Sequence, residues 1–157
     1  MTKSNQIPEV PLEQALAIAK KHHQLGNLTL ADRTYKDIIS VYPENYIGLR
    51  YLGILAYQRG VYNEGIDYLE RALKIDDSEP ETWNTYAVNL ELLGQIDKAI
   101  EAWNKALKLR PDYPDALSNY GNALWKKGDF KKAQQVCEKA LAIKPDFYPA
   151  LINLGGA

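Results

Sequence analysis

The chain has 157 residues, of which 46% are hydrophobic and 25% are charged, and its formal net charge is −1 at pH 7. These averages are those of globular proteins and exclude a disordered or fibrous chain, and the near-zero charge argues against nucleic acid or an anionic membrane as partner. The single Cys137 cannot form an internal disulfide, and no apolar run approaches the roughly 18 residues of a membrane span. We therefore expect a soluble, cytoplasmic protein.

Residues 1–11, MTKSNQIPEVP, hold no apolar segment of signal-peptide length, and we expect them to be disordered. After them the chain repeats itself with a period of 34 residues, which is visible in five columns of mostly small, apolar or proline residues. The columns are Gly26, Gly60, Gly94 and Gly128; Ala31, Gly65, Ala99 and Ala133; Ile38, Ala72, Ala106 and Ala140; Pro43, Asp77, Pro111 and Pro145; and Ala19, Gly53, Ala87, Gly121 and Gly155. Such a period indicates an array of stacked structural repeats.

Each period contains two predicted helices, and residues 80–113 show the pattern clearly. Residues 80–94, PETWNTYAVNLELLG, place apolar side chains at positions 83, 86, 87 and 90, which is the stripe of an amphipathic helix. Gly94 supplies the left-handed backbone that ends this helix without a Cβ penalty. Residues 95–112 carry a second apolar face, and Pro111 ends that helix because proline cannot continue the backbone hydrogen bonds. The sequence shows no strand pattern, so the expected fold is all-α.

This pattern resembles the tetratricopeptide repeat, a helix pair of 34 residues. The clearest copy lies at 114–147, with Leu117, Tyr120, Gly121, Leu124, Gly128, Ala133, Cys137, Ala140 and Pro145. Residues 80–113 add the signature Trp83, whereas the two earlier units depart from the pattern at His22, Gly65 and Asp77. The resemblance implies units at 12–45, 46–79, 80–113 and 114–147, followed by a truncated first helix of a fifth unit at 148–157. It also implies a right-handed superhelix of stacked antiparallel helix pairs, an α-solenoid.

The last segment, 148–157, keeps Leu151, Leu154 and Gly155 in register and stops before a second helix. Each unit of such an array buries its face against a neighbour, so an array normally finishes with a polar capping helix. We therefore expect the sequence to be a piece of a longer array. The uncovered face at Leu151 and Leu154 predicts one alternative function, self-association into a homo-oligomer through the C-terminal end. A second alternative is the non-catalytic arm of a larger enzyme such as a glycosyltransferase.

Catalytic and metal-binding patterns are missing from the sequence. His22 and His23 are adjacent, so they point about 100° apart on a helix and cannot hold one metal ion together. Cys137 falls in an apolar column of the repeat, where we expect a buried, inert thiol. The carboxylates lie in exposed columns, and Glu70 with Lys74 is typical of a surface ion pair on one helix. We expect no enzyme activity, no cofactor and no metal.

The basic stretch at 126–132, KKGDFKK, is better explained as a solvated turn between helices than as a nucleic-acid site. Asp129 interrupts the lysines, and no pair of base-reading side chains recurs from unit to unit, as it does in RNA-binding helical repeats. We therefore expect neither a nucleic acid nor a membrane as partner.

In tetratricopeptide arrays the first helix of each unit lines a concave inner face, and the resemblance implies that a peptide binds there. Applying the register gives a set of aromatic, amide, apolar and charged side chains, which we call the inner-face set. Its members are Lys20, Arg50, Tyr51, Ile54, Tyr57, Asn84, Thr85, Val88, Glu91, Ser118, Asn119, Asn122, Trp125 and Asn153. Rings supply contact area, amides bond to a peptide backbone and charges set its orientation. The predicted function is a protein-interaction scaffold that binds a peptide or partner segment.

Two sites known in tetratricopeptide proteins sharpen this expectation. The clamp for chaperone tails uses lysine and asparagine in one unit, asparagine in the next, and lysine with arginine in a third. Those places are held here by Arg50 and Ile54, then Thr85, then Asp115 and Asn119, so chaperone C-termini are disfavoured as partners. Asn119 and Asn153 instead fall in the column that forms an asparagine ladder in the repeat arm of O-linked N-acetylglucosamine transferases. The units also resemble those of bacterial tetratricopeptide scaffolds, and the sequence does not name the partner.

Overall fold

The computed structural model describes residues 10–155. Residues 1–9, which include most of the segment predicted to be disordered, lie outside the described residues, as do residues 156–157. The described chain forms nine helices and no strand: α1 Leu12–Gln24, α2 Leu28–Val41, α3 Tyr46–Gln58, α4 Tyr62–Ile75, α5 Pro80–Leu92, α6 Ile96–Leu109, α7 Pro114–Lys127, α8 Phe130–Ile143 and α9 Tyr148–Gly155. The predicted all-α class and right-handed superhelix of stacked helix pairs are confirmed.

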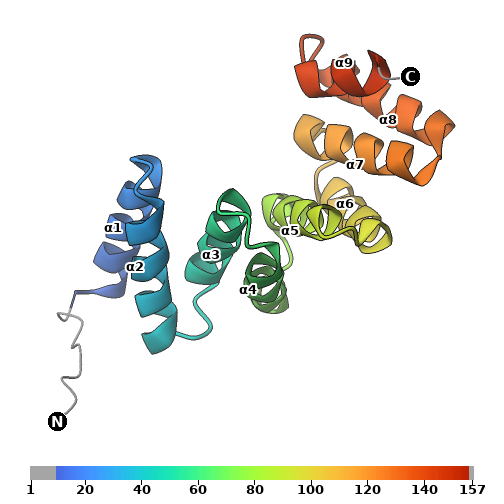
Figure 1. The fold of residues 1–157 in the computed structure, drawn as a ribbon. Coiled ribbons are helices and arrows are strands. Elements are labelled where there is room, and N and C mark those ends of the chain that lie inside the picture. The colour runs from blue at the N-terminus through green and yellow to red at the C-terminus, as the bar shows by residue number, and fades with distance from the viewer. Residues whose placement is uncertain (1–9, 156–157) are drawn as a thin grey trace.

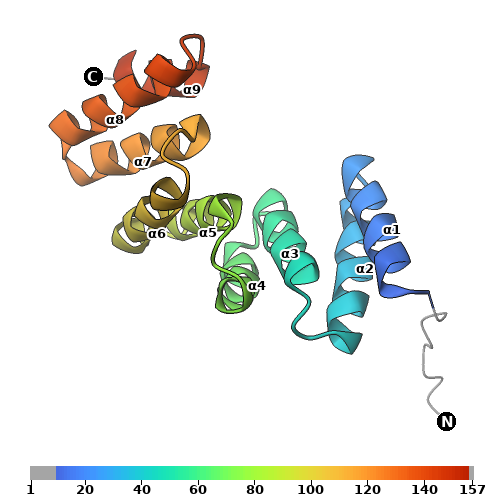
Figure 2. The same cartoon turned by 180° about the vertical axis from the view of Figure 1, so that it is seen from behind.

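The helices pack as pairs, α1 with α2, α3 with α4, α5 with α6 and α7 with α8, and each pair also contacts the next. The pairs form an arc that runs from α1 and α2 to α9 (Figure 1). Helices α3, α5 and α7 lie on the concave side of this arc and α4 and α6 on its outer side, and the view from behind shows the same order (Figure 2). The division of the chain into units at 12–45, 46–79, 80–113, 114–147 and 148–157 stays a prediction.

A glycine with left-handed backbone follows the first helix of each pair. The φ angle is 75° at Gly26, Gly60 and Gly94 and 86° at Gly128. After α5 the amide of Gln95 donates to Leu90 O at 2.9 Å, which satisfies a carbonyl at the end of the helix. Pro111 comes soon after the end of α6 at Leu109. The left-handed residue predicted at Gly94 is confirmed.

The apolar columns of the sequence lie buried between the helices. Tyr35, Leu69 and Trp103 are fully buried and Cys137 is 1% exposed, so the predicted burial of the cysteine is confirmed. Burial, with a smaller contribution from the charge of Glu138, raises the pKa of the Cys137 thiol above its ordinary value. The thiol therefore stays protonated at neutral pH, which is the inert form.

The buried side chains form two hydrophobic clusters. The N-terminal cluster surrounds Tyr35 and joins α1, α2 and α3. The C-terminal cluster surrounds Trp103 and extends from α5 to α9, and Trp83 and Trp125 pack against it. Each cluster is built layer by layer from neighbouring helices, so the stability of the array comes from contacts between adjacent units.

The ion pair predicted between Glu70 and Lys74 is not formed. Glu70 Oε1 instead accepts a hydrogen bond from the hydroxyl of Tyr86 at 2.9 Å. An exposed pair on one helix contributes only about 0.3–0.5 kcal/mol, so a half-buried hydroxyl on the neighbouring helix α5 competes with it effectively.

Candidate functional site

The inner-face set predicted from the sequence is distributed over five helices. Its members lie as follows: Lys20 on α1; Arg50, Tyr51, Ile54 and Tyr57 on α3; Asn84, Thr85, Val88 and Glu91 on α5; Ser118, Asn119, Asn122 and Trp125 on α7; and Asn153 on α9. Lys20 and Tyr57 are exposed, Ser118 is buried, and the other members are half-buried. The set thus combines side chains that reach solvent with side chains held against neighbouring helices.

Side-chain hydrogen bonds join the first helices of successive pairs to one another. His23 Nε2 and Gln58 Oε1, at 2.9 Å, connect α1 to α3. The hydroxyls of Tyr46 and Thr82, at 2.7 Å, connect α3 to α5. These bonds therefore add polar contacts between successive pairs to the apolar packing between their helices.

The amide of Asn84 is a junction between α5, α6 and α7. Its Oδ1 accepts from Trp103 Nε1 at 2.9 Å and from Asn119 Nδ2 at 3.3 Å. Further along the face, Asn153 Nδ2 donates to Ser118 O at 3.0 Å and to Ser118 Oγ at 3.1 Å. Two asparagines of the predicted ladder, Asn119 and Asn153, therefore each bond to the preceding first helix.

Glu91 holds a second connection between α5 and α7. Its Oε1 accepts from Asn122 Nδ2 at 2.9 Å and from Lys126 Nζ at 2.8 Å. The side chain of Glu91 is only 9% exposed, while that of Lys126 is 50% exposed. The carboxylate of Glu91 is thus paired with a lysine and an amide of α7.

Aromatic rings and one arginine gather around Tyr51 of α3. Tyr51 stacks on Tyr35 with ring centroids 5.2 Å apart and an interplanar angle of 2°, and the His23 ring meets Tyr51 edge-on at 5.7 Å. The guanidinium of Arg50 lies 5.6 Å from the centroid of Tyr51. Burial of Tyr35 raises its pKa well above the ordinary value for tyrosine, so the Tyr35 hydroxyl stays protonated at any physiological pH.

Arg50 forms no ion pair within residues 10–155, and its buried Nε has no hydrogen-bond partner there. The nearby carboxylate of Glu81 is engaged by Arg110 on the outer edge of the face. Burial works to raise the pKa of Glu81, but the hydrogen bond and charge of Arg110 and the charge of Arg50 outweigh it and hold this pKa below its ordinary value. Glu81 therefore pairs with Arg110 through Oε1, whereas Arg50 interacts with Glu81 through its charge and forms no ion pair among the described residues.

The sequence analysis did not identify the partners of these side chains. The register also places His23 and Gln58 on the inner face, whereas Thr82 was not predicted there, although its hydroxyl bonds across to Tyr46 of the preceding pair. A signal was present in the spacing, because His23 and Gln58 are 35 positions apart and Tyr46 and Thr82 are 36 apart, slightly more than one period. Polar residues at that offset on successive first helices are therefore candidates for such cross-connections.

Groups of three or more histidine, cysteine or carboxylate side chains able to hold a metal ion do not occur in the described part of the chain. None of the helices between residues 10 and 155 combines the length and apolar character required to span a bilayer.

The fold and this face define a helical repeat scaffold, and family models agree with that class. A model described as a TPR repeat matches residues 92–128, and two described as a tetratricopeptide repeat match residues 114–147 and 16–80. The chain belongs to the tetratricopeptide repeat family, which is generally non-catalytic, and it is a protein-interaction scaffold. A comparison with curated protein sequences finds no match.

Solved structures share the same architecture. The crystal structure of MamA is 28% identical, with 88% of this chain and 81% of that chain covered and a TM-score of 0.82. An O-GlcNAc transferase mutant from Thermobaculum terrenum is 25% identical, with a TM-score of 0.78, and the match covers 83% of this chain but 26% of that chain. The APC/C hetero-tetramer Cut9-Hcn1 is 22% identical, with 92% and 29% covered and a TM-score of 0.85, which shows the fold alone.

Proposed function

We propose that the chain binds an extended segment of a partner protein along its inner-face set. The observation that carries this proposal is the state of Arg50 on α3, whose guanidinium forms no ion pair among the described residues. A carboxylate or carbonyl of a guest peptide satisfies such a group with charge-assisted hydrogen bonds.

The amides of α7 supply groups that suit a peptide backbone. Asn119 and Asn122 each use one Nδ2 hydrogen bond to contact α5. Each primary amide also has a second N–H and an acceptor oxygen, so both a donor and an acceptor remain for a guest. An extended backbone presents both kinds of group, which favours a peptide over a compact apolar ligand.

Apolar contact area lies between the arginine and the amides. Ile54 and Val88 are half-buried on α3 and α5, and Tyr57 is 43% exposed beside Tyr62, with ring centroids 6.5 Å apart. Side chains of an extended peptide alternate in direction, so every second one would contact these residues. Binding needs no chemistry at this face, and we propose that the chain acts without catalysis.

The test is a pair of substitutions on the inner face. A partner retrieved with the wild-type chain is purified, and its dissociation constant is measured by calorimetry against the wild type and against Arg50→Ala with Ile54→Ala. We expect at least a tenfold weaker complex, about 1.4 kcal/mol, because a charged contact and an apolar contact are lost together.

The matched control is Arg33→Ala with Val41→Ala, which likewise removes one arginine and one aliphatic side chain, here from the second helix α2, where both are exposed. Equal affinity for the inner-face and control variants would contradict the proposal.

Light scattering of the chain alone over a dilution series tests the alternative, self-association through α9, where Tyr148 and Ile152 are 74% and 70% exposed.

A further inference from the structure

A groove of about 520 Å³ lies on the outer side of the arc, away from the inner-face set. Its walls are α4 and α6, and its floor is the side of α5 that carries Trp83 and Tyr86. The lining residues are Glu70, Leu73, Lys74, Asp77, Trp83, Tyr86, Lys98, Glu101, Ala102 and Lys105. We call it the α4–α6 groove. Its volume falls within the roughly 300–1,000 Å³ of pockets that hold ligands.

The aromatic floor of the groove is fixed in place before anything binds. Trp83 Nε1 donates to Asp77 O at 2.8 Å, and the Tyr86 hydroxyl donates to Glu70 Oε1 at 2.9 Å. The two rings meet edge-to-face, with centroids 6.2 Å apart and an angle of 71°. The polar atoms of both rings are therefore satisfied inside the chain, and what the floor offers a guest is rigid apolar surface, which binds at a low entropy cost.

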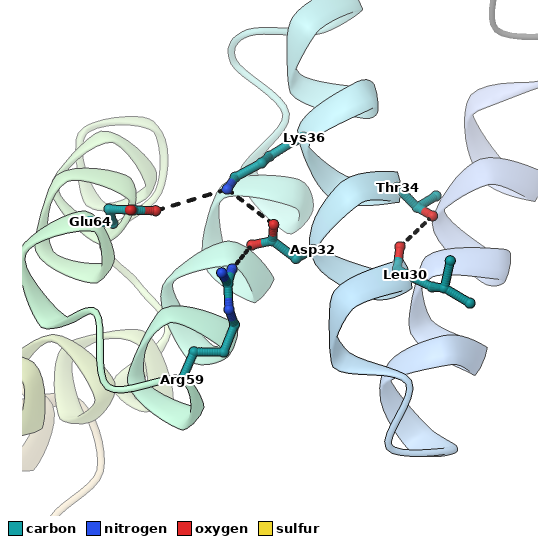
Figure 3. A network of polar contacts seen from close by, with 6 residues as sticks. All are labelled: Leu30, Asp32, Thr34, Lys36, Arg59 and Glu64. Atoms are coloured by element: carbon teal, nitrogen blue, oxygen red, sulfur yellow. Dashed lines mark hydrogen bonds and ion pairs between the residues drawn. The ribbon is translucent and has the colours of Figure 1, made fainter.

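An ion pair crosses the corresponding space between α2 and α4. Lys36 Nζ lies 3.9 Å from Glu64 Oε2, and on the same side of α2 Arg59, at the end of α3, pairs with Asp32 at 2.8 Å (Figure 3). Glu70 and Lys98 hold the places equivalent to Lys36 and Glu64 one period later, yet Glu70 bonds to Tyr86 instead. The bridge that crosses the earlier space is thus absent from the α4–α6 groove.

Two positions in this groove differ from the equivalent positions of the neighbouring repeats, and both differences leave it more open. One period before Ala102 the chain carries Tyr68, which packs against the N-terminal cluster, and one period after it carries the buried Val136. At the next step along the array, Lys132 Nζ lies 5.4 Å from the ring centroid of Tyr120, in the place that Lys98 holds here. The small Ala102 and the uncommitted Lys98 therefore leave the rings of the α4–α6 groove uncovered.

The walls of the groove decide what kind of segment fits. Both walls and the floor are helices, whose interior backbone groups bond within their own helix and offer nothing to an extended chain. A helical guest, which satisfies its own backbone, therefore suits this groove better than an extended one. The inner face differs, since its amide side chains can bond to an extended backbone.

The charges on the two rims are opposite in sign on balance. The α4 rim carries Glu70, Lys74 and Asp77, and the α6 rim carries Lys98, Glu101 and Lys105. None of Lys74, Lys98 and Lys105 forms an ion pair within residues 10–155. A guest helix with acidic residues on the flank toward α6 and basic residues on the flank toward α4 complements both rims.

We propose that the α4–α6 groove is a second docking surface, which takes an amphipathic helix of a partner protein. The apolar stripe of that helix lies on Trp83 and Tyr86, with acidic side chains facing Lys98 and Lys105. The chain then holds two partner segments at once, an extended one inside the arc and a helical one outside it.

The probe for this proposal is a synthetic helical peptide of about 20 residues, long enough to be helical in water. It carries leucines at i, i+3, i+4 and i+7, glutamates on one flank and lysines on the other. A second peptide has the same leucines and lysines on both flanks. Binding is measured by fluorescence anisotropy, and the site is located by the indole N–H signals of the three tryptophans in NMR spectra. We expect the first peptide to bind at least tenfold tighter than the second and to shift the Trp83 signal most.

Two variants of the protein complete the test. Lys98→Glu with Lys105→Glu changes exposed rim charges only, and we expect at least a tenfold loss of the first peptide. Lys131→Glu with Lys139→Glu makes the same change of charge on α8 and should leave binding unchanged. Ala102→Tyr introduces the residue that Tyr68 supplies one period earlier and should block the groove.

Four results would overturn the proposal: no binding of the first peptide, equal binding of both peptides, no shift of the Trp83 signal, or equal losses in the α6 and α8 charge variants. Arg50→Ala with Ile54→Ala serves as the separate control for the inner face and should bind the peptide as the wild type does. A loss in that variant would place the peptide inside the arc and would also overturn the proposal.

Discussion

Asn89 is a polar side chain in the interior between α4 and α5. It is fully buried, its Nδ2 donates to Thr85 O at 2.8 Å, and its Oδ1 has no hydrogen-bond partner among the described residues. A Cβ added to Gly65 would lie 2.6 Å from that Oδ1 and 3.2 Å from Ala56 Cβ. The glycine, which departs from the alanine of its column, therefore makes the room that the buried amide occupies.

This contact predicts that Gly65→Ala changes the free energy of unfolding in opposite directions in the wild-type chain and in the Asn89→Ala variant. In the wild-type chain Gly65→Ala should lower the free energy of unfolding by about 1–3 kcal/mol, because the added methyl group overpacks against Asn89. In the Asn89→Ala background the same substitution should raise it by up to about 1 kcal/mol, the ordinary preference of a helix for alanine over glycine. Urea unfolding of the four chains gives the coupling energy. A gain in both backgrounds would show that the two residues do not compete for space.

The sequence shows that Gly65 replaces the alanine found elsewhere in its column, but not why it does so. A column of repeats shows that glycine stands where alanine is usual, whereas the residue that fills the space lies on the next pair at a position with no column of its own. The same limit applies to Arg50, which was placed on the inner face from its register. That it lacks a carboxylate partner depends on Arg110 engaging Glu81, and side-chain partners of this kind do not follow from a period.

At the scale of single elements, the helix ends were predicted more fully than their contacts. The 34-residue period predicted that helices end at the recurring glycines and prolines. The structure agrees, since φ at the glycines is positive and α6 ends before Pro111. Which side chain on one helix bonds to the next was not predicted, as Glu70 shows by pairing with Tyr86 on α5. Local backbone preferences repeat with the sequence, but each step of the array has its own side chains.

The role of Gly94 in ending α5 can be tested by substitution, because its φ is 75° and an added Cβ would have nothing within 4 Å. Gly94→Ala should lower the free energy of unfolding by about 1–2 kcal/mol, because an alanine in the left-handed region meets its own backbone. Gly94→Asn should cost less, since asparagine tolerates that region better. Circular dichroism during urea unfolding measures both. Equal costs for alanine and asparagine would rule out backbone strain as the cause.

At the scale of the whole molecule, the two hydrophobic clusters divide the array. The buried members of the N-terminal cluster lie on α1, α2 and α3, and those of the C-terminal cluster start at α5. Helix α4 borders both, because Tyr68 packs against the first and Ile66 against the second. Linear arrays are stabilised only by neighbouring layers, so damage at one end need not reach the other. Both docking surfaces proposed above cross or border this division, so its strength decides whether the scaffold acts as one rigid body.

The tryptophans report on one side of this division. Trp103 belongs to the C-terminal cluster and Trp83 and Trp125 pack against it, so tryptophan fluorescence follows that part of the chain. Circular dichroism follows the helices of both parts. Tyr35→Ala removes a fully buried ring from the N-terminal cluster, a loss of roughly 3–5 kcal/mol. We expect it to produce an early transition in circular dichroism while the fluorescence midpoint in urea stays close to that of the wild type.

The matched variant is Leu124→Ala, which removes a buried side chain from the C-terminal cluster and should move the fluorescence midpoint to lower urea. Coincident transitions of both signals in Tyr35→Ala would mean that α4 couples the clusters strongly enough for the array to unfold as a single unit. A guest bound across the inner face of α3 and α5 would add to that coupling. A ligand for the inner face should therefore bring the two transitions of Tyr35→Ala together, whereas a helix in the α4–α6 groove should stabilise the later transition more.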